Sequence, residues 1–315
     1  CALPIYLLVK IENCTKAGDA NGAEETLQQI KDSHFGTAQE FLKGDVLVKA
    51  STRLHELFDE LSSLVKGLVL LKECTPRSHD ALVSFGELLS TTIVYYRALQ
   101  RGIQAELLDS RNYITTDNHF SSATPDFHKT YNKIQEAVQP KPNGLLIAQG
   151  FIGRTDDGAT TTLGRGGSDY SATIYGAALA AEEVQIWTDV NGIMTSDPRI
   201  VSAAKTIAEI SYEEAAELAY FGAKVVHPST IQPAVEKSIP VVVKNTRDTD
   251  GEYSIITAQT KEKGLRAIAG KKNITLINIS SSRMLNAYGF LRRIFAIFDT
   301  YKTPVDLIAT SEVSV

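Results

Sequence analysis

From about residue 103, short apolar runs alternate with segments of helical periodicity, and this alternation constrains the fold more than any other feature. Four runs predict strands: Ile103–Leu108, Leu145–Gln149, Val184–Trp187 and Pro240–Lys244. Helical segments are predicted between or after them, near 127–138, 169–182, 211–221 and 229–237. Such alternation predicts an α/β fold with a mostly parallel sheet covered on both faces. Ligands collect at the carboxyl ends of such strands, so the residues that follow each strand are site candidates.

The first hundred residues carry helical periodicity instead. One apolar stripe links Leu27 to Phe41, and a longer one links Leu47 to Leu68. Residues 78–100 predict a further helix, which Ser78 can cap. The chain is therefore expected to open with a helical layer.

The last seventy residues read as a second, smaller unit. Residues 246–263 are polar and turn-rich with one apolar patch, which predicts a closing strand followed by a linker. Beyond them the pattern predicts a strand at Ile274–Ile279, a helix at Gly289–Tyr301 and a strand at Val305–Ala309. This β-α-β unit is too small to bury its sheet alone, so it needs more chain or a partner.

Charge and cysteine content exclude several classes of protein. The 315 residues hold 32 Lys and Arg against 37 Asp and Glu, a net charge of −5, which argues against a surface built to bind nucleic acid. The three cysteines show no CxxC spacing, and neither a disulfide framework nor a metal site is predicted. No apolar run reaches the ~18–20 residues of a membrane span. We expect a cytoplasmic protein with no membrane partner.

The densest candidate site is the glycine-rich segment from Thr160 to Thr173. Three glycines within four positions allow the backbone to approach a ligand, and the helix that begins near Ser168 presents N–H groups to an anion. Arg165 adds a planar fork suited to a carboxylate or a phosphate. Asp169 lies in the first helical turn, where its alternative interpretation is a simple cap.

Two further clusters follow predicted strands or helices. After Val184–Trp187, the residues Thr188, Asp189 and Arg199 should reach the crevice, although an ordinary Asn-Gly turn explains the segment equally well. In the segment 221–228, Lys224 is a candidate anion ligand or a plain surface charge, and His227 reads as structural.

Glu87 stands among apolar neighbours in the segment Ser84–Thr91. An unpaired carboxylate there costs several kcal/mol, of the order found for buried polar groups. Glu87 therefore requires a cationic partner, from the protein or from a substrate.

Taken in this order and spacing, these segments resemble aspartate kinases of the amino acid kinase family, in the monofunctional, lysine-sensitive form. The resemblance covers roughly residues 78–315 and rests on SFGELLST, QGFIG, TTTLGRGGSDYSA, IWTDVNGIMTSDPR, ISYEEAAELAYFGAKVVHP, RMLNAYGFL and VDLIATSEVSV. It implies a three-layer α/β/α sandwich over residues 1–245, a closing strand and linker at 246–263, and a partial, ferredoxin-like ACT module at 264–315.

The implied activity is ATP-dependent phosphorylation of the side-chain carboxylate of L-aspartate, with Mg²⁺, in the biosynthesis of lysine, threonine and methionine. By resemblance, Glu87 would hold the aspartate ammonium, Arg165 its α-carboxylate, and Asp169 would organise the reacting end. The rest of the amino-acid pocket would be formed by Phe151, Gly166, Gly167 and Ser168. The nucleotide would be surrounded by Thr188, Asp189, Met194, Arg199, Lys224 and Val225.

The ACT resemblance implies feedback inhibition by lysine and association into a dimer or larger oligomer through ACT domains. The positions that match lysine ligands in the lysine-sensitive enzymes are Met284, Gly289, Phe290, Leu291, Asp306 and Thr310.

The chain also departs from the family pattern. The family's Lys-Phe-Gly-Gly-Thr-Ser motif is absent, and Pro4, Ile5 and Tyr6 stand where a substrate-contacting threonine would fall. We therefore expect a fragment cut at both ends that is catalytically weak or inactive. Two alternatives remain open: a non-catalytic, amino-acid-binding regulatory subunit, and a family member that phosphorylates glutamate, acetylglutamate or a nucleotide.

Overall fold

The computed structural model describes residues 2–138, 144–221, 226–260, 264–270, 274–280, 288–303, 305 and 307–310. The chain divides into two compact units, Cys1–Gly270 and Lys271–Val315, which are described separately.

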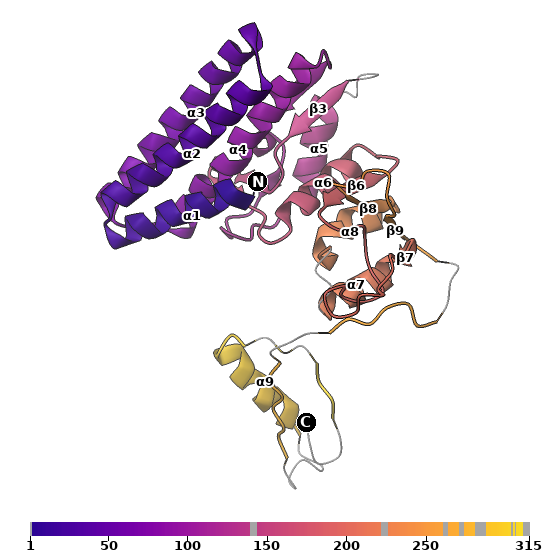
Figure 1. The fold of residues 1–315 in the computed structure, drawn as a ribbon. Helices are drawn as coiled ribbons and strands as arrows, with labels where there is room; N and C mark the ends of the chain where they lie inside the picture. Colours follow the sequence, from indigo (N-terminus) through magenta and orange to yellow (C-terminus); the bar gives the residue numbers. More distant parts are fainter. Residues whose placement is uncertain are drawn as a thin grey trace. The chain divides into compact units, whose positions relative to one another are not determined.

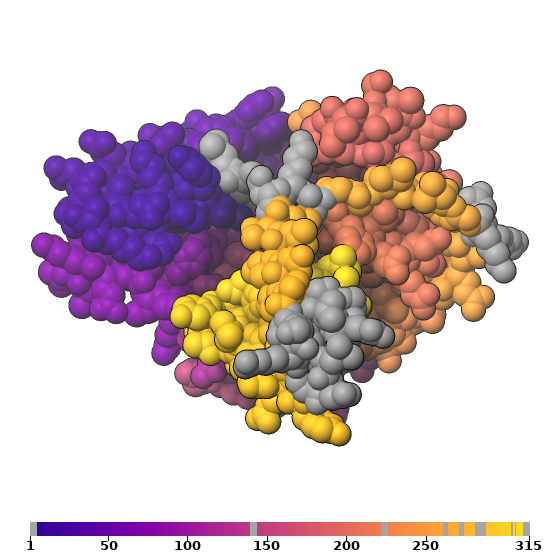
Figure 2. Space-filling view, turned by 90° about the horizontal axis from the view of Figure 1, so that it is seen from below, coloured from indigo at the N-terminus to yellow at the C-terminus, as the bar shows by residue number. Residues whose placement is uncertain are grey.

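The first unit opens with a layer of long helices (Figure 1), made of α1 (Ala2–Ala17), α2 (Ala20–Phe41), α3 (Gly44–Leu71) and α4 (Pro76–Gln100). The two predicted apolar stripes are confirmed, because they supply one shared core that includes Ile30, Leu54 and Leu61. Figure 2 shows the indigo and violet side chains of this layer packed against one another as one body. Helix α1 was not predicted, and its Leu8 and Ile11 are fully buried in the same core.

Helix α4 begins earlier than predicted. Thr75 is its cap and accepts a hydrogen bond from the Ser78 backbone N–H, and Pro76 occupies the first turn. The prediction that Ser78 caps the helix is therefore wrong, since the helix already begins at Pro76, a residue type favoured at the first helical position.

The predicted alternation of strands and helices is confirmed. Strand β1 (Ala105–Leu108) pairs in parallel with β3 (Leu145–Ala148), and β6 (Val184–Thr188) pairs in parallel with β8 (Val241–Asn245). The closing strand is β9 (Ser254–Thr257), antiparallel to β8 and parallel to β7 (Glu209–Ser211). The unit is thus an α/β fold, with a mostly parallel four-stranded sheet in the order β6-β8-β9-β7.

Besides the two-stranded sheet β1-β3 and the four-stranded sheet, the described residues form a third, unpredicted sheet. It joins the short strands β2 (Thr115–Thr116), β4 (Ile152–Thr155) and β5 (Thr160–Thr162), in the order β2-β4-β5. Strands this short and polar give too weak an alternating pattern to be recognised in a sequence.

Four helices accompany the strands: α5 (Phe127–Ala137), α6 (Gly167–Ala178), α7 (Tyr212–Tyr220) and α8 (Pro228–Glu236). Helix α7 starts in a capping box, in which Ser211 and Glu214 each accept a backbone N–H of the other. Helix α6 stops four residues before its predicted end, because Ala180 adopts a left-handed φ of 48° and the Ala181 N–H closes the turn on the Gly176 carbonyl.

A core packs beneath the four-stranded sheet. Val184 and Ile186 of β6 are buried with Val241 and Val243 of β8, whereas Trp187 points to the other face and is half-exposed. Since alternate residues of a strand point to opposite faces, one face of β6 holds the core and the other remains accessible.

The second unit contains α9 (Phe290–Thr300), which confirms the predicted helix. The predicted strands at 274–279 and 305–309 are wrong for the residues described there, which form no ladder and leave Leu276 and Leu307 largely exposed. A helix with two short strands cannot bury a sheet, so the strands have no stable partner. The ACT module therefore stays a prediction. None of the helices in the described part of the chain has the length and apolar character needed to cross a bilayer.

Candidate functional site

Glu87 lies on the inner face of α4, where its side chain is only 8% exposed. Burial raises the pKa of the Glu87 carboxyl above its ordinary value. Its backbone carbonyl accepts the hydroxyl protons of Ser90 and Thr91, but within the described part of the chain no side chain pairs with its carboxylate. The cation that the sequence requires for Glu87 is thus not supplied by any described side chain.

The turn after β3 packs directly on the start of α6. Phe151 adopts a left-handed φ of 70°, which is unusual for a residue with a side chain and is typical of functional turns. Its N–H donates to the Ser171 hydroxyl at 2.9 Å, and its ring packs on the core that includes α4. A Cβ on Gly150 would lie 3.1 Å from Ser168, so only glycine permits this close approach without a shift.

The glycine-rich segment leads into α6 through two left-handed glycines, Gly164 with φ 73° and Gly166 with φ 72°. Gly166 is the N-cap and provides no side-chain bond, so the first-turn N–H groups are not capped by a side chain. Arg165 is exposed between the two glycines. The segment therefore offers a guanidinium beside an uncapped helix end, an arrangement that favours anions.

Asp169 forms no capping hydrogen bond, although it lies in the first turn of α6 as the alternative interpretation required. It is the third residue of α6, it makes no hydrogen bond among the described residues, and burial raises its pKa. Asp169 is thus a half-buried carboxyl in the first turn of α6, where a negative charge suits the helix dipole.

Asp80 holds the glycine-rich segment to α4, and its role was not predicted. Its fully buried carboxylate accepts the Thr162 N–H at 2.8 Å, the Thr162 hydroxyl at 2.9 Å and the Ser121 N–H at 2.9 Å. These partners lie 41 and 82 residues away in sequence, so no local pattern could reveal them.

The second cluster follows β6. The Thr188 carbonyl accepts both the backbone N–H and the hydroxyl of Thr246, and the Thr188 hydroxyl donates to Asp189 at 3.3 Å. The next turn is anchored by buried Ser254, whose hydroxyl accepts the Ile193 N–H at 2.8 Å. The carboxyl ends of β6 and β8 are thus fixed to each other, while the Asp189 side chain remains exposed.

Met194 and Arg199 lie in the loop between β6 and β7. Met194 forms an isolated bridge with Thr206 and is half-buried. The exposed Arg199 guanidinium pairs with Asp197, with Nε to Oδ1 at 3.0 Å and Nη2 to Oδ2 at 2.8 Å. Part of its donor capacity is therefore already used within the turn.

A cation is sandwiched between aromatic rings on the accessible face of the same sheet. The Lys244 ammonium lies 5.0 Å from the ring centre of Trp187 and 5.2 Å from that of Tyr253. Trp187 directly precedes Thr188, so this cluster borders the predicted nucleotide site.

The third cluster falls partly outside the described residues, which exclude Lys224 and Val225. The structural interpretation of His227 agrees with its contacts: it is the residue before Pro228 at the start of α8, and its carbonyl accepts from the Thr230 hydroxyl at 2.7 Å. Of the predicted lysine positions, Gly289 is the N-cap of α9, and Phe290, Leu291 and Thr310 are described. Met284 and Asp306 lie outside the described residues.

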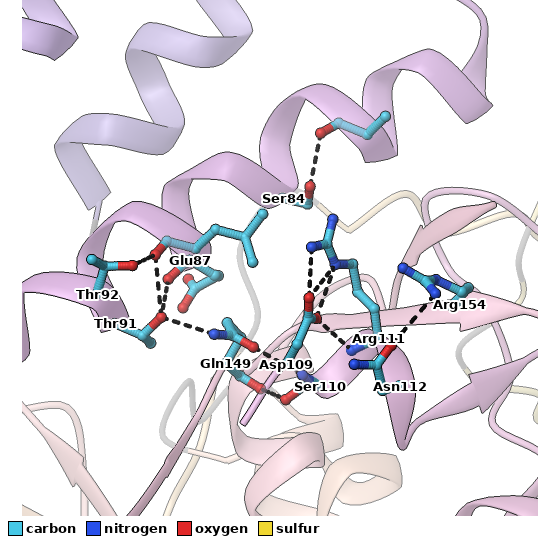
Figure 3. Close-up of polar contacts among 12 residues, drawn as sticks. Ser84, Glu87, Thr91, Thr92, Asp109, Ser110, Arg111, Asn112, Gln149 and Arg154 are labelled. Carbon is cyan, nitrogen blue, oxygen red and sulfur yellow. Dashed lines mark hydrogen bonds and ion pairs between the residues drawn. The ribbon is translucent and has the colours of Figure 1, made fainter. Parts of the chain in front are cut away.

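The fold thus places most predicted site residues of the first unit in two regions: the start of α6, and the carboxyl ends of β6 and β8. The turn that holds Phe151 contacts Gly167 and Ser168 directly, and α6 packs along α8. Figure 3 shows the hydrogen bonds that join Glu87 and Thr91 of α4 to Gln149 and Ser110. Gln149, like Asp80 and Ser254, was missed as a site residue because its polar partners come from distant segments.

The chain matches a known family and several of its members. The model of the amino acid kinase family matches residues 12–245. The lysine-sensitive aspartokinase 3 of Escherichia coli is 44% identical over 264 residues, 82% of this chain and 59% of that protein. The chloroplastic aspartokinase 1 of Arabidopsis thaliana is 40% identical, over 98% of this chain and 54% of that protein. The chain thus spans little more than half the length of these relatives.

Solved structures agree with the sequence comparison. The structure of E. coli aspartokinase III in complex with aspartate and ADP superposes with a TM-score of 0.81 at 40% identity, over 96% of this chain and 68% of that one. The same enzyme in complex with lysine and aspartate gives a TM-score of 0.79. With a family match over most of its length and these relatives, the chain belongs to the amino acid kinase family.

Proposed function

We propose that the protein of which this chain forms part transfers the γ-phosphoryl group of ATP to the side-chain carboxylate of L-aspartate, giving 4-phospho-L-aspartate and ADP. The observation that carries the proposal is the buried Glu87 carboxylate, which finds no cationic partner among the described residues. Its position on α4, beside the turn that packs on the glycine-rich helix start, suits the ammonium group of an amino acid.

The remaining charges suit the rest of an aspartate molecule. Arg165 would bind the α-carboxylate through its planar fork, and the uncapped start of α6 would face the side-chain carboxylate with its N–H groups. Phe151, Gly166, Gly167 and Ser168 would enclose the substrate. Asp169 would orient the reacting end, since its carboxyl lies in the first turn of α6.

The nucleotide would bind at the ends of β6 and β8. Thr188, Asp189, Met194 and Arg199 border this edge, and Lys224 and Val225 follow α7 in the sequence. Phosphoryl transfer depends mainly on positioning and on positive charge around the moving group, so no tuned general base is required. Mg²⁺ supplies further positive charge when it is bound to the ATP phosphates, and we propose that it enters with them.

Lysine is proposed as an inhibitor that binds the second unit, because a relative has been solved with lysine bound. Its site would include Gly289, Phe290 and Leu291 at the start of α9, together with Thr310, Met284 and Asp306. The half-exposed apolar side chains of α9 would also pair two copies of the chain. The regulatory-subunit alternative has no comparable support, since the relatives are named as kinases.

The test measures binding and turnover separately. Titration calorimetry should show L-aspartate binding to this chain and loss of binding in Glu87→Gln, with ADP binding retained. Turnover is measured by ADP release and by trapping the acyl phosphate with hydroxylamine, comparing L-aspartate with L-glutamate. Equal or better binding and turnover of glutamate, or unchanged aspartate binding in Glu87→Gln, would refute the assignment.

A further inference from the structure

We propose that Gln149 is a positioning residue for the amino-acid site, which fixes the helix carrying Glu87 to the turn carrying Phe151. The inference deepens the proposed function and rests on it for the identity of the ligand.

Gln149 is a buried amide, 3% exposed, whose side chain bridges two separate elements. Its Nε2 donates to the Thr91 hydroxyl of α4 at 3.0 Å, and its Oε1 accepts the Ser110 N–H at 2.9 Å. The Ser110 hydroxyl in turn donates to the Gln149 carbonyl at 2.6 Å. Both ends of the amide are thus engaged, as a buried polar group requires.

The direction of these bonds is determined by their donors (Figure 3). The Thr91 hydroxyl points its single proton at the backbone of α4, at 2.7 Å from the Glu87 carbonyl and 3.4 Å from that of Leu88, so its oxygen accepts from Gln149. The Ser110 backbone can only donate, so it requires the amide oxygen. The amide therefore has one permitted orientation, and Gln149 is connected to the backbone of Glu87 through one hydroxyl.

The two residues after Gln149 contact the start of α6. Gly150 lies against Ser168, and the Phe151 N–H donates to the Ser171 hydroxyl at 2.9 Å. The Ser110 hydroxyl also lies 3.0 Å from the Tyr175 hydroxyl of α6. The amide thus links α4, which carries the proposed ammonium ligand, to the turn that packs on the start of α6, where the proposed carboxylate ligands lie.

The spacing between α4 and the start of α6 matters more for binding the amino acid than for binding the nucleotide. An amino acid must meet Glu87 and the start of α6 together, and a displacement of about 1 Å can cost on the order of 100-fold in rate. The ends of β6 and β8, where the nucleotide is proposed, take no part in this hydrogen-bond network. Loss of the amide should therefore weaken the amino-acid site and spare the nucleotide site.

The test uses Gln149→Met, which keeps the length of the side chain and removes its hydrogen bonds. We expect the Kd or KM for L-aspartate to rise about 10- to 100-fold, with the values for the nucleotide changed less than about twofold. The matched control is Gln135→Met, which removes the 2.9 Å hydrogen bond that the Gln135 amide donates to the Ala178 carbonyl at the opposite end of α6. The control should leave both constants unchanged.

A second pair of variants covers the case in which Gln149→Met does not fold. Thr91→Val at a half-buried position should reproduce the selective loss, and Thr91→Ser, which restores a hydroxyl, should recover it. Amide hydrogen exchange without ligand should rise in residues 147–152 and in the first turn of α6 for Gln149→Met and Thr91→Val. Equal losses of affinity for L-aspartate and for the nucleotide, or unchanged hydrogen exchange at these residues, would overturn the inference whether or not the ligand is aspartate. If hydrogen exchange rises at these residues but the protein does not bind L-aspartate, the proposed function alone would be refuted.

Discussion

The buried carboxylate of Asp80 should be among the most costly side chains to remove from the first unit. Its oxygens accept from the backbone N–H groups of Ser121 and Thr162 and from the Thr162 hydroxyl. Asp80→Ala would leave the buried N–H and hydroxyl of Thr162, and the part-buried N–H of Ser121, without this acceptor. Hydrogen bonds to a charged group contribute roughly 1.5–3 kcal/mol each, and such values do not add fully. We therefore expect Asp80→Ala to lower the free energy of unfolding by about 3–5 kcal/mol.

Two companion variants calibrate this value. Thr162→Val keeps the side-chain shape and removes one of the three bonds, so it should cost about 1–2 kcal/mol. Asp126→Asn changes a carboxylate that caps α5 by accepting the Lys129 N–H from a more exposed position, and should cost at most about 1 kcal/mol.

The assay is urea unfolding followed by circular dichroism, with midpoints compared at an unchanged slope. Combining Asp80→Ala with Thr162→Val should cost less than the sum of the two single changes, because both remove the same bond. A cost of Asp80→Ala below about 1 kcal/mol, or one equal to that of Asp126→Asn, would show that the carboxylate does not hold the glycine-rich segment to α4.

Three further predictions concern individual groups. Because the folded-state pKa of Glu87 is raised, its ionisation destabilises the fold as pH rises through that pKa. Glu87→Gln should therefore raise the Tm more at pH 8 than at pH 4, and an equal change at both pH values would contradict this. Gly167→Ala would place a Cβ 2.7 Å from the Phe151 ring and should weaken aspartate binding by about tenfold. Gly36→Ala, in open space within α2, should stabilise the protein by about 1 kcal/mol and leave aspartate binding unchanged. Equal effects of the two variants on aspartate binding would refute the role of the close approach. Burial raises the pKa of Cys74 to about 11, so its alkylation at pH 8, followed by mass spectrometry, should be about two orders of magnitude slower than that of an ordinary thiol, and rapid labelling would contradict it.

The sequence predicted elements whose signals are local. The apolar runs at Val184–Trp187 and Pro240–Lys244 predicted β6 and β8, because buried parallel strands are rich in β-branched residues. Glu87 was found because a carboxylate among apolar residues is conspicuous within a few positions of sequence. The apolar stripes of α2 and α3 could be recognised equally well, since a helix repeats its pattern over many turns.

What the sequence missed depends on contacts between distant segments. Asp80 reads as an ordinary polar residue near a helix start until Ser121 and Thr162 are brought to it by the fold. Gln149 reads as the last residue of a strand, although its amide joins α4 to the Ser110 turn. The strands expected at 274–279 and 305–309 had adequate local patterns, but pairing depends on partners that a pattern cannot supply.

The aromatic sandwich of Lys244 gives the chain a built-in optical reporter. Trp187 is the one tryptophan among the 315 residues, and it is 42% exposed immediately before Thr188. Its indole emission therefore arises from a single place, at the border of the proposed nucleotide site and beside a cation whose distance affects that emission. Nucleotide affinity, the effect of each substitution on it, and the rate of binding should all be measurable from the unlabelled protein by exciting this one side chain.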